Sequence, residues 1–362
     1  MVAGDLNGDG IDDVVIQAEK SFVNGVRGAV QVLLSNGAGT FTTHAHGVPR
    51  VDTVGLGDFN GDGALDIAAA RDGTDDVSIF RGNGDGTFQD RMVVDAGRNS
   101  HGYLATGDLN NDGFDDIVVA SDRSELRVFY GEDSSDLVNG SPSVFGGLGD
   151  DAEDLVLADF NNDGFLDAAV SAERDDRVEV LLNDGAGALG TPIVGKTLDR
   201  EIATIASGDF NNDGNADVAL SGDGYGDMIV LYGAGDGSFD DEQRFVVTDL
   251  GDGYGDIAVA DYNSDGADDV AVSIFETPRW EVFRLRDVNV LLNNDNNATE
   301  PVDLDLGAGD NLAYTENDGA RQLLPTVTVT GDDINRATVA LPTNFLMSED
   351  SLAFTPAAGI TG

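Results

Sequence analysis

The sequence predicts an all-β fold, and three features support this prediction. The first is a nine-residue pattern, D-x-N-x-D-G-x-x-D, which occurs six times at intervals of 50 to 53 residues and begins at Asp5, Asp58, Asp108, Asp159, Asp209 and Asp261. The second is composition: the 362 residues include 48 glycines and 68 acidic residues, and aspartate and glycine favour turns over helices. The third is a series of short β-branched runs between these turns, which is typical of strands.

Each repeat has the same order of elements. A first run, such as 103–107, leads into the pattern, and the residue before its first Asp is always small: Gly4, Gly57, Gly107, Ala158, Gly208 or Ala260. A second run follows, as at 117–120, and a third comes later, as at 178–182. A glycine-rich turn, as at 83–88, precedes a weaker fourth run, as at 92–94. Four antiparallel strands per repeat, arranged around an axis, describe a β-propeller blade. The pattern occurs six times, and Met1 already falls inside the first predicted strand, so we expect a ring of six or seven four-stranded blades.

The pattern places oxygen ligands where a calcium site needs them. Calcium takes six to eight oxygens, and the pattern offers side chains at positions one, three, five and nine, a glycine turn at six and a main-chain carbonyl at seven. An EF-hand also needs a Glu at position twelve and flanking helices, whereas position twelve is apolar here. Three carboxylates in one loop repel without a counter-ion, and turn formation alone does not require three acids in each of six loops. We therefore expect about six Ca²⁺ sites.

The predicted calcium ligands share the same five positions in every copy, with position seven contributing its carbonyl. They are Asp5, Asn7, Asp9, Ile11 and Asp13; Asp58, Asn60, Asp62, Ala64 and Asp66; Asp108, Asn110, Asp112, Phe114 and Asp116; Asp159, Asn161, Asp163, Phe165 and Asp167; Asp209, Asn211, Asp213, Asn215 and Asp217; and Asp261, Asn263, Asp265, Ala267 and Asp269.

These loops, together with turns such as 82–88, resemble the FG-GAP/VCBS-type repeats of the integrin α N-terminal propeller over residues 1–297. The resemblance implies a propeller, usually of seven blades, with calcium loops between the first and second strands of several blades. Residues 298–362 differ, because they lack a calcium loop and contain short predicted strands at 312–319, 326–330, 337–339 and 352–354. This segment resembles the start of a cadherin-like or VCBS adhesin-type domain. It is shorter than a complete sandwich domain of about 100 residues, so we expect a partial β-sandwich-like domain.

Charge and composition exclude several classes of function. The net charge of -49 argues against binding to nucleic acid or to an anionic membrane surface, because phosphate neutralisation needs basic patches. The absence of cysteine excludes disulfides, thiol catalysis and thiolate metal sites. The chain shows no signal peptide and no apolar run that could insert into a membrane. Calcium loops of this kind need abundant calcium, so we expect an extracellular or cell-surface location and a chain that is part of a longer multidomain protein.

The sequence favours a binding module over an enzyme. We expect a calcium-stabilised propeller of a secreted or surface bacterial protein, acting in adhesion or in binding an unknown protein or glycan. A lectin-like or polysaccharide-processing module and a structural spacer of a large adhesin are the alternatives. The candidate ligand surface is a basic aromatic group, Arg279, Trp280, Arg284 and Arg286, in the long loop predicted at 275–287. Packing of this hairpin on a neighbouring blade or on the following domain is the alternative for that surface.

Overall fold

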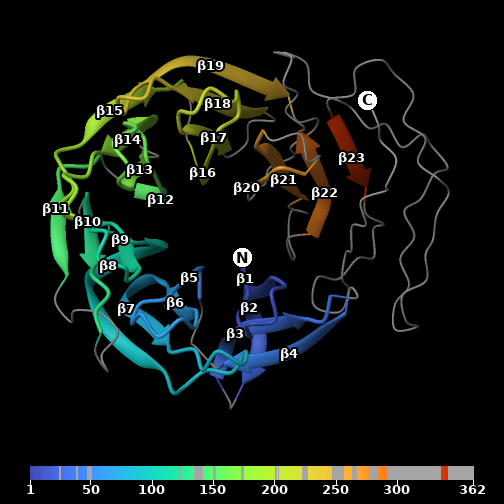
Figure 1. Ribbon diagram of the computed structural model, residues 1–362. Helices are drawn as coiled ribbons and strands as arrows, with labels where there is room; N and C mark the ends of the chain where they lie inside the picture. Colours follow the sequence, from blue (N-terminus) through green and yellow to red (C-terminus); the bar gives the residue numbers. More distant parts are fainter. Residues whose placement is uncertain are drawn as a thin grey trace.

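The structure is a computed structural model. It describes residues 1–291, except 24–25, 38–39, 47–50, 122–123, 134–141, 150–151, 173–174, 200–201, 203, 222–226, 247–256, 263–266 and 277–283, and it also describes residues 336–340. This part of the chain contains 23 β-strands, which form sheets arranged in a ring (Figure 1). No helix within these ranges has the length and apolar character needed to cross a membrane.

Four of the six blades are separate four-stranded sheets, and every strand pair within them is antiparallel. Blade one contains β1 (Val2–Gly4), β2 (Asp13–Val23), β3 (Val26–Ser35) and β4 (Phe41–His46). Blade four contains β12 (Ala152–Ala158), β13 (Asp167–Ala172), β14 (Arg177–Leu181) and β15 (Ile193–Thr197). Blade five contains β16 (Thr204–Gly208), β17 (Asp217–Ser221), β18 (Asp227–Gly233) and β19 (Phe239–Val246). Blade six contains β20 (Ile257–Ala260), β21 (Asp269–Glu276), β22 (Arg284–Leu291) and β23 (Arg336–Ala340).

Blades two and three share a strand and form one seven-stranded sheet. Its members are β5 (Thr53–Gly57), β6 (Asp66–Ala70), β7 (Asp72–Phe80), β8 (Met92–Gly107), β9 (Asp116–Ser121), β10 (Glu125–Phe129) and β11 (Ser143–Gly146). The sequence predicted two separate runs, at 92–94 and 103–107, where the structure has the single strand β8. The two runs merge because the connection between them stays extended: Ser100 pairs with Thr74 of β7 and with Ser121 of β9.

The predicted all-β propeller of four-stranded blades is confirmed, and each blade begins with its innermost strand (Figure 1). Blade six takes its fourth strand from the segment that the sequence separates from the propeller. The predicted strand at 337–339 lies within β23, which pairs with β22 through Val339 opposite Val288. The rest of residues 298–362 lies outside the described ranges, so the partial sandwich domain and its boundary stay a prediction.

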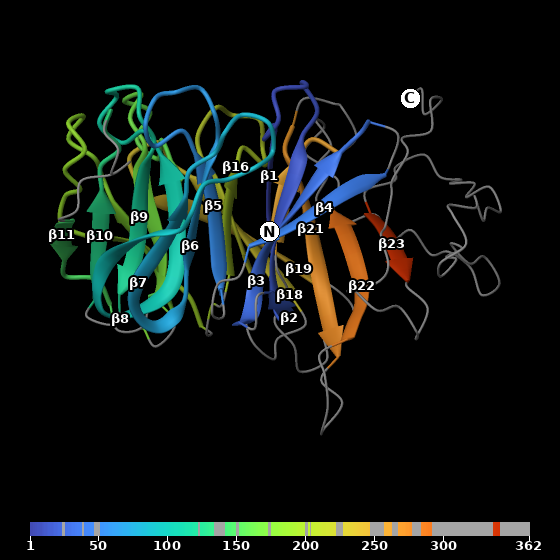
Figure 2. The same ribbon diagram turned by 90° about the horizontal axis from the view of Figure 1, so that it is seen from below.

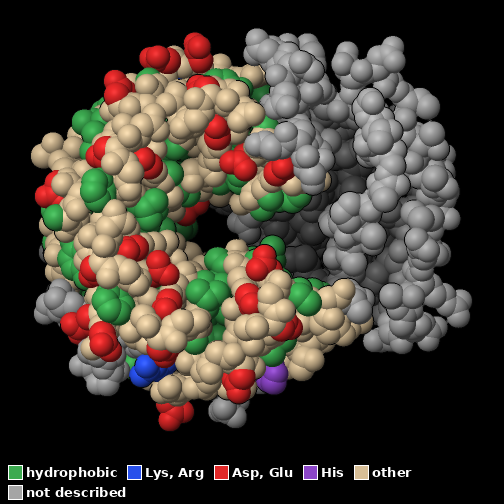
Figure 3. All heavy atoms as spheres, in the orientation of Figure 1, with side chains coloured by type: hydrophobic (Ala, Val, Ile, Leu, Met, Phe, Trp, Pro, Cys, Tyr) green, Lys and Arg blue, Asp and Glu red, His purple; other side chains and the backbone are tan. Residues whose placement is uncertain are grey.

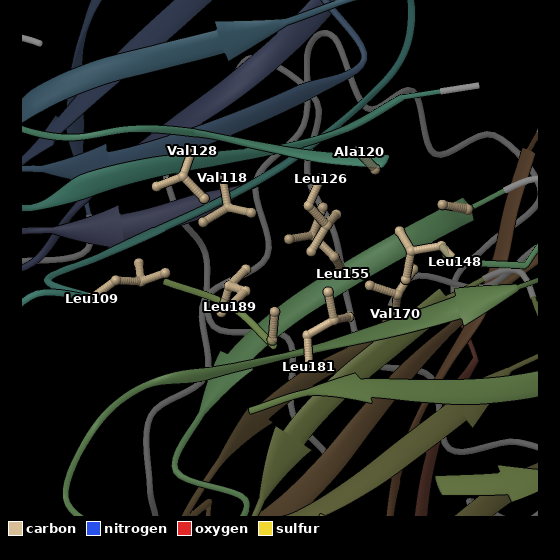
Figure 4. Packing of buried hydrophobic residues seen from close by; sticks show 12 residues of the cluster. Leu109, Val118, Ala120, Leu126, Val128, Leu148, Leu155, Val170, Leu181 and Leu189 are labelled. Carbon is tan, nitrogen blue, oxygen red and sulfur yellow. The ribbon is translucent and has the colours of Figure 1, made fainter. Parts of the chain in front are cut away.

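The hydrophobic core lies between neighbouring blades. Strand β6 shows why, because all five of its residues are buried and they alternate between two junctions: Ile67 and Ala69 face blade one, while Ala68 and Ala70 face blade three. Side chains on a strand point alternately to opposite faces, so a sheet covered on both faces needs apolar residues throughout. At the junction of blades three and four, Leu126 and Val128 pack against residues of blade four such as Leu181 (Figure 4).

The small residue before each pattern is explained by crowding at the inner strands. A Cβ atom on Gly57 would lie 2.6 Å from the Phe59 ring and 2.8 Å from Asp115 of the next blade. At the equivalent position in blade five, a Cβ on Gly208 would lie 2.9 Å from both Phe210 and Val259. The close approach of adjacent inner strands therefore accounts for glycine there.

The junction after blade six differs from the other five. In the first five patterns the residue at position two packs against the following blade and is 0–6% exposed, namely Leu6, Phe59, Leu109, Phe160 and Phe210. Tyr262, at the same position in the sixth pattern, is 44% exposed. The six blades match the six copies of the pattern, and the five junctions between consecutive blades are packed.

Candidate metal-binding loops

The six copies of the pattern join the first strand of each blade to the second. We number these loops one to six with their blades and refer to residues by their position, one to nine, within the pattern. Because the strands alternate in direction, all these loops lie at one end of the ring, where the dark-blue loop after β1 is seen at the upper edge in Figure 2. Loops one to five are described completely, whereas Asn263 and Asp265 of loop six lie outside the described residues.

The position-one carboxylate organises each loop by accepting main-chain hydrogen bonds. Asp5 accepts from the N–H groups of Gly8 at 2.8 Å, Asp9 at 3.1 Å and Gly10 at 2.8 Å. These bonds hold the pKa of Asp5 below its usual value, and the largest cause is the hydrogen bond from the Gly10 N–H. The glycine at position six donates in the same way in loops two to five, at 2.8–2.9 Å. Its φ of 80° to 91° in loops one to five lies in the left-handed region, which explains why glycine is required.

Positions three and five turn their short side chains back into the same loop. In loop three, Asn110 Oδ1 accepts from the N–H of Asp112 at 3.0 Å, and Asp112 Oδ1 accepts from the N–H of Phe114 at 3.0 Å. Asn110 Nδ2 donates to Asp112 Oδ2 at 2.9 Å, and loops four and five repeat this bond. Position four adopts a left-handed φ of 54° to 60° in these three loops, at Asn111, Asn162 and Asn212, which asparagine tolerates better than most residues.

Position nine has a structural role that the sequence did not reveal. In loop two, Asp66 is fully buried, its Oδ2 accepts from the N–H of Phe59 at 3.2 Å, and its Oδ1 accepts from the N–H of Gly82 at 2.7 Å. The first donor follows the first strand of the blade and the second follows the third strand, so one carboxylate ties the two strand ends together. The same pair of bonds is made by the buried residues Asp13, Asp116, Asp167 and Asp217. The periodic Asp at this position is thus explained in part without a metal.

Burial also makes ionisation of these position-nine carboxyls costly. Desolvation raises the pKa of Asp66 and Asp167 to about 6 and that of Asp116 and Asp217 to about 7. The main-chain N–H donors oppose this rise, and nearby acidic residues of the same loop add to it. Each of these loops therefore concentrates negative charge beside a buried carboxyl, and a bound cation would relieve the repulsion.

The side chains fit calcium in their chemistry but are not gathered into a finished site. Positions one, three, five and nine provide only oxygen donors, which match a hard cation such as Ca²⁺. Across the described ranges, no group of three or more His, Cys, Asp or Glu side chains is drawn together closely enough to hold a metal ion. The oxygens of positions one, three and five instead accept mainly from groups of their own loops, as in loop three, and those of position nine accept in addition from an N–H at the end of the third strand.

Among the five completely described loops, loop two differs because a cationic side chain reaches it. Arg81 Nη2 donates to Asp62 Oδ2 at 3.0 Å and to Asn60 Oδ1 at 3.3 Å. These oxygens belong to positions five and three of the pattern. Burial acts to raise the pKa of Asp62, but the N–H of Ala64 and the Arg81 guanidinium outweigh it, so that this pKa is lowered.

The loops are also part of the contacts between blades. The carbonyl at position two accepts a hydrogen bond from the next blade in four cases: Leu6 from the Gly86 N–H at 2.9 Å, Phe59 from the Glu132 N–H at 3.1 Å, Leu109 from Asn183 Nδ2 at 2.7 Å and Phe160 from the Gly237 N–H at 3.0 Å. At position eight, Asp115 and Asp268 accept from the N–H groups of Asp58 and Asp209 in the preceding blade, at 2.8 and 2.9 Å. Changes in a loop are therefore transmitted directly to the junction between two blades.

The candidate ligand surface is only partly described. Arg279 and Trp280 lie outside the described residues. Arg284 and Arg286, which the sequence placed in a loop, lie in strand β22, so that prediction was wrong for these two residues. Arg284 pairs with Glu276, and a register shift between Ile274 and Phe275 leaves Arg286 as the extra residue of a bulge. The strand continues through the arginines because β21 offers partners for it up to Glu276.

A comparison with family models identifies the repeats. The FG-GAP-like repeat matches residues 58–119, 108–170 and 209–272. Each match begins at the first Asp of a loop and ends in the strand after the following loop, so the three matches together contain loops two to six. The chain is an FG-GAP-repeat β-propeller.

Solved structures agree with this fold. The FG-GAP propeller is similar to a lectin of Agrocybe aegerita, whose structure is described as the basis of specific recognition of non-reducing terminal N-acetylglucosamine, with 21% identity, a TM-score of 0.53 and coverage of 82% of this chain and 81% of that chain. It is also similar to BBS1N in a complex with ARL6DN, with 10% identity, a TM-score of 0.51 and coverage of 80% and 77% of the two chains. At these identities the likeness shows the fold alone. Curated proteins gave no match.

Proposed function

We propose that this FG-GAP propeller is a calcium-stabilised binding module of an extracellular or cell-surface protein, with no enzymatic activity of its own. The observation that carries the proposal is the repeated loop geometry, in which oxygens of positions one, three and five are held in a tight turn beside the buried carboxyl of position nine. The ligands would be the position-one, -three, -five and -nine side chains and the carbonyl of position seven. FG-GAP repeats are typical of extracellular proteins, which supports this location.

Calcium would act here through charge. The ion neutralises carboxylates that repel one another within each loop, and its binding to the folded state alone stabilises that state. At ten times its dissociation constant, each site adds about 1.4 kcal/mol to the free energy of unfolding. Because each loop also contacts the next blade, this stabilisation extends to the junctions.

Calorimetric melting tests the proposal. The metal-free protein should melt at a lower temperature than the protein in millimolar CaCl₂, and MgCl₂ at equal concentration should restore less, because Mg²⁺ demands a smaller, octahedral site. Melting temperatures that agree in calcium and in chelator would rule out a stabilising role for the ion.

Glycan binding is a second candidate for the ligand of this module. It is favoured by the similarity of fold to a lectin over most of both chains. A glycan array that includes terminal N-acetylglucosamine, followed by a depolymerisation assay on any polysaccharide that binds, tests this candidate. Binding without turnover supports a lectin-like module, turnover would replace it with an enzyme, and no binding would leave a protein partner or a spacer role in a larger adhesin.

A further inference from the structure

The position occupied by Arg81 is filled by neutral residues in the other blades that the structure describes here. It is the residue directly before the N–H that bonds to Oδ1 of position nine, and its equivalents are Leu34, Tyr130, Leu182 and Tyr232. Arginine therefore enters this position only in blade two among blades one to five. The hydrogen bonds of its guanidinium to Asn60 and Asp62 are a property of loop two alone among the five completely described loops.

The packing of the next blade explains why this side chain turns onto its own loop. In blades one and four, Leu34 and Leu182 lie against the glycine turns of the following blades, and a Cβ on Gly86 or Gly237 would meet them. In blade three, Tyr130 donates its hydroxyl to the carbonyl of Gly187 in such a turn at 2.8 Å. Blade three has no G-x-G-x-F or G-x-G-x-L turn after its third strand, since Gly131 is followed by Glu132 and Asp133. The glycine turn that contacts the equivalent residue of blades one, three and four is thus missing above Arg81.

The guanidinium occupies the same oxygens that a metal ion would need. Asn60 Oδ1 and Asp62 Oδ2 are both within hydrogen-bond distance of Arg81 Nη2. A divalent ion in loop two would have to displace the guanidinium from both oxygens and would then sit close to a like charge, which is unfavourable. An arginine has no acceptor and stays protonated at all accessible pH values, so titration does not remove this conflict.

We propose that Arg81 takes the place of the calcium ion in loop two, so that this loop is neutralised by its own chain and the propeller binds one calcium ion fewer than it has copies of the pattern. This proposal rests on the calcium binding proposed for the other loops. Loop two would then hold its shape in the absence of calcium, whereas the loops without an arginine would depend on the ion.

Native mass spectrometry of the full chain in calcium tests the number of sites. The Arg81→Leu variant, which carries the residue found in blades one and four, should bind one calcium ion more than the wild type. Arg244→Leu is the matched control, because Arg244 is 32% exposed against 30% for Arg81 and also forms ion pairs, with Asp199 and Glu242. Arg244 lies in β19, the fourth strand of blade five, and its ion pairs involve no residue of the six patterns. The control should bind the wild-type number. Equal numbers for Arg81→Leu and the wild type would overturn the proposal.

Position-one variants test the same point without changing the arginine. Asp108→Asn should lose one calcium ion relative to the wild type, whereas Asp58→Asn should lose none, because loop two holds no ion. In the Arg81→Leu background, Asp58→Asn should remove the added ion. Loss of one ion from Asp58→Asn alone would overturn the proposal. A wild type that binds no calcium would instead refute the calcium proposal, and if Arg81→Leu also binds none, the role of Arg81 falls with it.

Discussion

The position-nine carboxylates make the sharpest prediction about stability. Asp217 is fully buried and accepts from the N–H of Phe210 at 2.9 Å and from the N–H of Gly233 at 2.7 Å. In Asp217→Ala, both N–H groups lose their acceptor in a buried place, and each such loss costs about 1–3 kcal/mol. We therefore expect the free energy of unfolding to fall by about 2–6 kcal/mol. Asp217→Asn keeps one acceptor oxygen, so its cost should lie between that of the wild type and that of alanine.

The control for this prediction is position five of the same loop. Asp213 accepts from the N–H of Asn215 and from Asn211 Nδ2 within the exposed loop, and exposed substitutions of this kind cost about 0.5 kcal/mol. Urea unfolding followed by far-UV circular dichroism in chelator should therefore separate the two alanine variants clearly. If both variants unfold at the same urea concentration in chelator, the idea that position nine ties the strand ends together is wrong.

Three further predictions concern ions, pH and backbone strain. Removal of calcium from five sites held at ten times their dissociation constant should lower the free energy of unfolding by about 7 kcal/mol, measured by calorimetry in chelator. In chelator, the stabilising contribution of four buried carboxyls, Asp66, Asp116, Asp167 and Asp217, should be greatest below pH 4 and should be lost as the pH rises through about 6 to 7, because burial raises their folded-state pKa values. Urea midpoints across this range check it. Gly61→Ala should destabilise the protein more than Gly63→Ala, although both glycines have a positive φ. An added Cβ would lie 2.5 Å from Phe114 in the first case and would meet nothing within 4 Å in the second, and melting temperatures of the two variants test this.

Much of the fold was predictable because the repeat is local. Position one, the glycine at six and the small residue before the pattern act within a few residues of one another, so their pattern is visible in the sequence, and the blades follow from the runs between them. Strand β8 was not predictable as one element, because its continuity depends on the pairing of Ser100 with two other strands. The placement of β23 in blade six was likewise hidden, since 44 residues separate it from β22.

The sequence predicted which residues form the loops but not the structural role of each residue. The sequence treats the three acids of a loop as equivalent ligands, whereas the structure separates them. The carboxylate at position nine bonds to two N–H groups that are distant in sequence, as Asp167 does with Phe160 and Asn183. Arg81 lies 19 residues from Asp62, and no periodic signal points to their contact, because arginine occurs at that position only once in the described blades. The second bond of position nine and the Arg81 contact both come from residues at the end of the third strand, so they depend on how that end lies relative to the loop.

The arrangement of loops and junctions indicates that calcium would stabilise the ring more than any single blade. A blade already has its position-nine carboxylate to join its first and third strands, and this link requires no ion. The loop as a whole, however, lies between blades, because its position-two carbonyl accepts from the next blade and Asp115 and Asp268 reach back to the preceding one. Acidic side chains are scattered over the described part of the face seen in Figure 3. Repulsion among the loop carboxylates would therefore act at the junctions between blades, where neighbouring sheets share their hydrophobic core. A bound ion would relieve this repulsion. Loop two would differ from the other loops, because the Arg81 guanidinium would neutralise its carboxylates in place of an ion.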